Sequence, residues 1–197
     1  MYKNPLNKFK TLSRLIDQAI LPATILIAAK ILSLILLNEK FNLDWQVGTS
    51  GIIYSSKQDF IFANSYSSLF MYLAISVGLI LLIIKATRWH ATHIKPSLAA
   101  KFHEKNLDFL ITDSVDIYVK STIWISYAWL TTALMFIQNF YGLLIPWVSY
   151  TALSMSIIFT VLIIMDVEKE INVKSNKPSL KDSNIYLSDL AQVLKNT

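Results

Sequence analysis

Four apolar stretches limit what this chain can fold into, because each is close to the length that crosses a bilayer. Residues 66–84 and 143–165 contain no charged side chain over 19 and 23 positions. Residues 121–137 contain none over 17, and residues 16–37 carry two charges over 22. A helix needs about 20 predominantly apolar residues to span the hydrocarbon core. We therefore predict an all-α membrane protein, a four-helix transmembrane bundle with spans at about 16–37, 64–85, 118–138 and 143–165.

Composition supports a lipid environment for most of the chain. Hydrophobic residues make up 54% of the sequence and charged residues 16%, whereas soluble domains carry about 25% charged residues. The chain contains no cysteine, which excludes disulfides, cysteine-ligated metals and thiol redox chemistry. We expect one transmembrane domain over residues 1–170 and a cytoplasmic tail over 171–197. The first span is longer than the apolar region of a signal peptide, so we expect a retained anchor.

The positions of the basic side chains predict the orientation. Fourteen Lys and Arg residues lie in the N-terminal arm, in the loop between spans two and three, and in the C-terminal tail. Only Lys40 and Lys57 lie in the loop between spans one and two. Basic loops remain on the cytoplasmic side, so we predict a multi-pass protein of the plasma (inner) membrane with both termini cytoplasmic. No nucleic acid is expected as a partner, because these charges flank the spans.

Three segments outside the spans have structure-forming patterns. In the extracytoplasmic loop, 52–54 and 60–62 favour β-strands around a turn-like 55–59, which predicts a small β-hairpin; an aromatic loop resting on headgroups is the alternative. The inner loop contains start signals at Pro96 and Ser97 for an amphipathic cytoplasmic helix. The tail has leucines at helical spacing near 187–194, which predicts a second short amphipathic helix.

The three histidines, His90, His93 and His103, all lie in the inner loop. His90 and His93 are three residues apart, so they would share a helix face and could form a metal site with His103 and Glu104. No His-Glu-x-x-His motif is present, nor a nucleophile elbow or a phosphate-binding glycine loop. We interpret the histidines as interfacial side chains and expect neither a metal, a cofactor nor catalytic residues.

Lys30 is the ionisable residue inside the first span. It shares a helical stripe with Ala19, Ala23, Leu26, Ser33 and Leu37, which predicts that this stripe faces protein. Counting inward from the outer ends of the other spans places Tyr72 and Thr132 at a similar depth, with no carboxylate among the residues there. Three states are open for Lys30: it extends outward to the interface, it is buried as a neutral amine bonded to hydroxyls such as Tyr72, or it pairs with an anion outside this chain.

Three functions are compatible with these patterns. A non-enzymatic membrane subunit, or an accessory or assembly protein, fits the lack of a catalytic set. A small oligomeric transporter or channel would use Lys30, with Tyr72 and Thr132, to contact an anionic substrate. A metal-dependent membrane enzyme would use the inner-loop histidines. We expect the first, with the lipid bilayer and another membrane subunit or further copies of the chain as partners.

Overall fold

The computed structural model describes residues 5–49, 51–90, 94–107, 110–111 and 113–175. Within these ranges side chains are described from residue 18 onward, apart from 96, 114 and 173–175. The chain is mostly helical, with five helices and one two-stranded hairpin in this part. In order these are α1 Pro5–Lys40, β1 Trp45–Gly48, β2 Gly51–Tyr54, α2 Lys57–Trp89, α3 Pro96–Glu104, α4 Ser114–Phe140 and α5 Pro146–Ser175.

Three of the described helices are long and apolar enough to cross a membrane, at Gln18–Lys40, Lys57–Trp89 and Pro146–Asn172. They give the chain the character of a multi-pass membrane protein. The predicted third span corresponds to α4, which has 27 residues but is not among these three candidates. Its middle carries Trp, Tyr, Ser and Thr among the aliphatic residues, and these side chains lower its apolar character.

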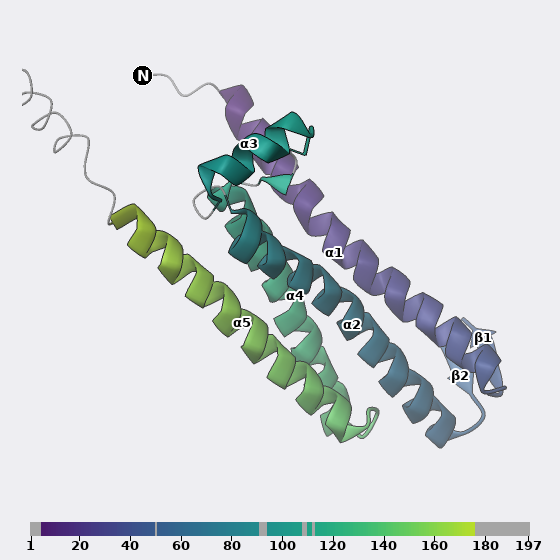
Figure 1. Cartoon of the computed structure of the whole chain (residues 1–197). Coiled ribbons are helices and arrows are strands. Elements are labelled where there is room, and N and C mark those ends of the chain that lie inside the picture. The colour runs from purple at the N-terminus through teal and green to yellow at the C-terminus, as the bar shows by residue number, and fades with distance from the viewer. Residues whose placement is uncertain (1–4, 50, 91–93, 108–109, 112, 176–197) are drawn as a thin grey trace, which may run out of the picture.

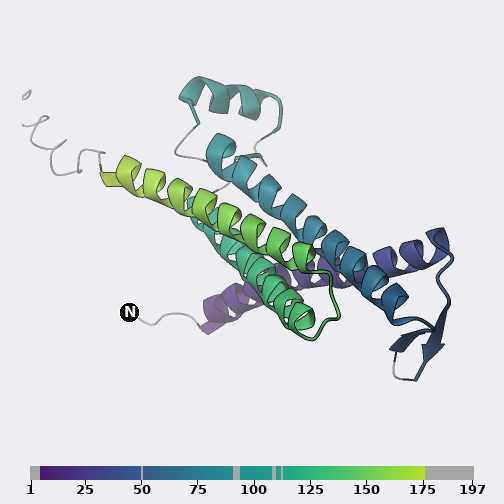
Figure 2. The same ribbon diagram turned by 90° about the horizontal axis from the view of Figure 1, so that it is seen from below.

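The four long helices lie side by side, and α3 lies across the end of the bundle opposite the hairpin (Figure 1). The hairpin lies at the opposite end, beside the C-terminal end of α1 and the start of α2. Seen from below, α1 crosses the other long helices at an angle (Figure 2). The core joins α2, α4 and α5 through buried Tyr72, Ile75, Leu79, Ala128, Met135, Val148 and Ala152.

The small-residue stripes of the sequence face the inside of this core. Ser121 and Thr132 of α4 and Ser149 and Ser156 of α5 are all at most 2% exposed. On α1, Leu26, Ser33 and Leu37 are buried as the stripe of Lys30 predicts. Close helix approach at small residues is the usual way in which membrane helices associate.

Gly78 of α2 lies directly against Trp124 of α4. A Cβ atom at this position would lie 1.8 Å from Cζ3 of Trp124 on α4. The indole ring therefore occupies the space that any other residue at 78 would need. This pairing of the smallest and the largest side chain sets the distance between α2 and α4.

The hairpin is present, but of its two predicted arms only 52–54 is a strand, within β2. β1 pairs antiparallel with β2, with Trp45 opposite Tyr54 and Gly48 opposite Gly51. Gly51 has φ +120°, which the tight turn requires. Residues 60–62, predicted as the second strand, belong instead to α2. The helix begins early because Ser56 caps it, its hydroxyl accepting a bond from the Gln58 amide at 3.2 Å.

For the other predicted helices that the structure describes, the helix is present and its ends differ from the prediction. The predicted inner-loop helix is α3, which begins at Pro96. Pro22 lies inside α1, yet α1 continues through it as one helix. The predicted tail helix near 187–194 lies outside the described residues.

Candidate functional site

Lys30 lies between α1 and α2, where its amine reaches three oxygen atoms of α2. The Nζ atom donates to the Asn64 carbonyl at 3.1 Å, to Asn64 Oδ1 at 2.9 Å and to Ser68 Oγ at 2.7 Å. An ammonium group has three donors, so these three acceptors match its full capacity. No carboxylate lies among these contacts, as the sequence indicates. As in the second state considered for Lys30, the amine is bonded within the chain, but its partners are Asn64 and Ser68 and not Tyr72.

Asn64 connects this amine to the rest of the bundle. Its side-chain amide donates to Gln138 Oε1 at 3.0 Å and to the Leu143 carbonyl at 2.8 Å. The Asn64 side chain therefore links α1, α4 and the connection between α4 and α5. The next residue, Ser65, accepts a bond from the Ile145 amide at 2.8 Å. Together these contacts form a polar network at the hairpin end of the bundle, here called the outer network.

Sequence reasoning missed Asn64 because it placed the start of the second span at residue 64. Residues counted inward from that point could not include Asn64 itself. Helix α2 begins at Lys57, so Asn64 lies about two turns inside the helix. A signal was available, because Asn64, Ser68 and Tyr72 are spaced four residues apart and form one stripe of α2.

Tyr72 and Thr132, the other two predicted site residues, lie close together without Lys30. The Tyr72 hydroxyl is 2.6 Å from Ser156 Oγ, which is 2.9 Å from Thr132 Oγ1. Tyr72 is 1% exposed and Thr132 is 2% exposed. Thr132 also donates to the Ala128 carbonyl at 2.9 Å. These hydroxyls satisfy one another at the centre of α2, α4 and α5, so they leave little surface for a ligand.

A second polar cluster lies at the end of the bundle opposite the hairpin, here called the inner cluster. His90 Nδ1 lies 3.2 Å from Glu170 Oε2, and both side chains are at most 3% exposed. The His90 ring packs near the Tyr118 ring with centroids 5.7 Å apart. Asp166 lies one turn before Glu170 on α5 and is 3% exposed. The inner cluster therefore joins the end of α2 to α4 and α5.

Of the three histidines considered for a metal site, the structure describes His90 and His103, and it places them in different surroundings. His90 is fully buried, whereas His103 is exposed on α3, and His93 lies outside the described residues. No group of three or more His, Cys, Asp and Glu side chains in the described ranges is placed to hold a metal ion. His90 contacts Glu170 of α5, which sequence reasoning missed. The signal for Glu170 is its place on the buried stripe of Phe159, Ile163 and Asp166.

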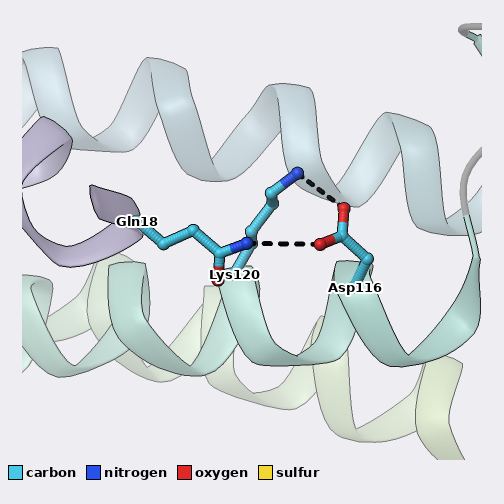
Figure 3. Close-up of polar contacts among 3 residues, drawn as sticks. All are labelled: Gln18, Asp116 and Lys120. Carbon is cyan, nitrogen blue, oxygen red and sulfur yellow. Dashed lines mark hydrogen bonds and ion pairs between the residues drawn. The ribbon is translucent and has the colours of Figure 1, made fainter. Parts of the chain in front are cut away.

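A third polar contact ties α1 to α4 near the same end. Gln18 Nε2 donates to Asp116 Oδ1 at 3.3 Å, and Lys120 Nζ lies 2.6 Å from Asp116 Oδ2. Figure 3 shows the amide and the ammonium meeting different oxygens of one carboxylate. Lys120 and Asp116 are one turn apart on α4, the spacing at which opposite charges stabilise a helix.

Comparison with known protein families, curated proteins and solved structures finds no match to this chain. The arrangement of its own side chains therefore carries the functional argument. In the described part of the chain, the buried polar groups named above link one helix to another.

Proposed function

We propose that the chain crosses the plasma (inner) membrane four times, with both termini cytoplasmic. Three helices are suitable spans by length and apolar character, and α4 is a fourth helix of 27 residues lying among them. The N-terminal end of α1 and the C-terminal end of α5 lie at the same end of the bundle (Figure 1). The fourteen basic residues outside the spans favour the cytoplasmic side for that end. Residues 1–170 would form one transmembrane domain, followed by the 171–197 tail.

Within that membrane, we propose a non-enzymatic subunit, or an accessory or assembly protein, of a larger complex. The observation that carries this proposal is the engagement of Lys30. Its amine bonds to Asn64 and Ser68 of the same chain, as expected of a side chain that holds two helices together. Tyr72 and Thr132 are likewise bonded to Ser156. An ionisable residue inside a span suggests a functional role. For Lys30, the contacts support a role in assembling the bundle.

The apolar surface of α1 supports association with another membrane protein or a second copy of the chain. α1 lies at the edge of the bundle, and Ile20, Ile27 and Ile31 on it are more than half exposed. If Lys30 bound a transported substrate, its amine would have to break its hydrogen bonds to the α2 oxygens each time a substrate bound. No contact in the described residues favours that exchange over the subunit function.

The proposal is tested by purifying the tagged protein from its native membrane in mild detergent. A subunit should carry a membrane protein in fixed stoichiometry, or form a defined homo-oligomer, by mass measurement of the intact complex. Ile27→Trp and Ile31→Trp on the open face of α1 should lower this stoichiometry, whereas Leu130→Trp on the exposed face of α4 is the matched control.

The opposite result is equally specific. A monomer that moves an anion across reconstituted vesicles, and loses this flux in the Lys30→Met variant while remaining folded, would replace the subunit proposal by transport.

A further inference from the structure

A groove opens between α1 and α2 at the hairpin end of both helices. It encloses about 540 Å³, which is within the range of small-molecule sites. On α1 it is lined by Ser33, Leu36 and Lys40, which are three and four residues apart and so lie on one helix stripe. On α2 it is lined by Phe62, Tyr66 and Phe70 at spacings of four.

The two stripes run antiparallel, so the groove follows the helix axes. Lys40 and Phe62 lie at its hairpin end, and Ser33 and Phe70 lie at its deep end. Seven residues separate Ser33 from Lys40, which corresponds to about 10 Å along the helix. The groove is therefore long, narrow and perpendicular to the plane of a membrane that these helices would cross.

The lining is suited to hydrocarbon. Leu36 is 63% exposed and Phe70 is 50% exposed, so the groove opens sideways, toward the lipid that surrounds two membrane-spanning helices. The only hydroxyl at its deep end is already bonded, because Ser33 Oγ donates to the Lys30 carbonyl at 3.0 Å and lies 3.4 Å from the Ser67 carbonyl. The deep part consequently has no unmet polar group that would select a polar ligand.

The mouth of the groove carries a cation. Lys40 is the last residue of α1 and is exposed, and its amine lies 5.9 Å from the Phe41 ring centroid. Among the described residues it makes no ion pair. Aromatic rings continue along this level, with Phe62 5.0 Å from Phe41 and 4.7 Å from Tyr66 between ring centroids. Such aromatic side chains mark the headgroup level of a membrane protein.

We propose that this groove binds one glycerophospholipid, with an acyl chain between α1 and α2 and the phosphate on Lys40. The positive charge of Lys40 favours the negatively charged phosphate, and the apolar deep part of the groove favours the acyl chain. A partner helix fits less well, because close helix packing uses small residues, whereas Leu36, Phe62 and Phe70 line this groove. The proposal does not depend on the subunit function, since a transporter or an enzyme of this fold would have the same groove.

The test is native mass spectrometry of the full chain with three lipids of identical acyl chains: phosphatidylglycerol, phosphatidylcholine and diacylglycerol. We expect one tightly held molecule of either phospholipid and at least about fivefold weaker binding of diacylglycerol, from the value of one basic residue for an anionic lipid. Lys40→Gln should weaken both phospholipids by about the same factor. Leu36→Trp, which fills the groove from an exposed position, should also expel them.

Two controls separate this site from general lipid contact. Lys57→Gln removes the other lysine at the hairpin end, which does not line the groove, and Leu130→Trp adds a ring to an exposed position of α4. Both should bind phospholipid as the unchanged protein does. Equal binding of diacylglycerol, or unchanged binding in Lys40→Gln, overturns the proposal. The proposal is also overturned if the unchanged protein is free of lipid but carries a bound polypeptide that is lost in the Leu36→Trp variant.

Discussion

At the scale of single residues, the polar side chains of the helices act as connectors. Asn64 accepts a hydrogen bond from the Lys30 amine, and its own side-chain amide donates to Gln138 and to the Leu143 carbonyl. Removing such a residue leaves several partly buried groups without partners. That penalty exceeds the value of any one bond, because each unsatisfied group keeps its desolvation cost.

We expect Asn64→Leu to lower the free energy of unfolding by about 1–3 kcal/mol, the cost of buried polar groups left without partners. The measurement is unfolding in mixed detergent micelles followed by circular dichroism. Asn139→Leu, near the same end of the bundle, is the control, because its side chain makes no hydrogen bond in the described structure. Lys30→Met combined with Asn64→Leu should recover part of the loss. An additive double variant would show that the two residues are not coupled.

The inner cluster makes a second prediction at this scale. His90→Leu removes the imidazole that lies 3.2 Å from the buried Glu170 carboxylate, and a buried polar group that loses a partner costs about 1–3 kcal/mol. His90→Leu with Glu170→Leu should be less destabilised than His90→Leu alone. Glu168→Leu serves as the control, since Glu168 is exposed two residues before Glu170. The same micelle titration measures all four proteins, and equal stability of His90→Leu and Glu168→Leu would contradict the role of the pair.

Residue pairings were harder to predict from the sequence than residue depth. Counting from the ends of their spans gave Tyr72 and Thr132 a similar depth, because helices rise uniformly, but it did not show that Lys30 bonds to other residues. Asn64 and Glu170 were missed, because apolar length defined the spans and both residues lie near polar boundaries. Pairing depends on how helices rotate about their axes, and a single sequence gives little information on that rotation.

At the scale of elements, the distance between α2 and α4 depends on one small residue. Gly78 is packed under Trp124 with no room for a methyl group. We expect Gly78→Ala to destabilise the bundle by about 1–3 kcal/mol, as overpacking does. Trp124→Leu in the same chain should restore most of the loss. Equal destabilisation with and without Trp124→Leu, again measured in micelles, would mean that the ring is not the obstacle.

The hairpin illustrates how local signals compete within an element. Residues 60–62 are β-prone, which predicted a strand, but Ser56 caps a helix just before them and Asp59 lies in its first turn. An acidic residue in the first turn and a serine cap both favour helix formation. The strand that does pair with Gly51–Tyr54 is Trp45–Gly48, where two glycines flank a two-residue turn. The existence of the hairpin was confirmed, and the position of one arm was wrong.

At the scale of the whole molecule, the absence of native cysteines allows a direct test of the proposed orientation. Ile53→Cys introduces a thiol on the exposed hairpin, and Lys101→Cys introduces one on exposed α3. In intact cells, a membrane-impermeant maleimide should label position 53 and leave position 101 unlabelled until the membrane is opened. Labelling of both positions, or of position 101 alone, would contradict the four-span arrangement with cytoplasmic termini.

The short turn between α4 and α5 has a consequence for how this chain enters a membrane. Gly142, with φ +65°, and the residues up to Ile145 reverse the chain within a few positions. Helix α4 is not among the three described helices that qualify as spans by length and apolar character. Because the turn is too short for α4 to insert independently, we expect α4 and α5 to enter as one helical hairpin. Helix α5 does qualify as a span, so we expect charges added to the middle of α5 to prevent the insertion of both helices.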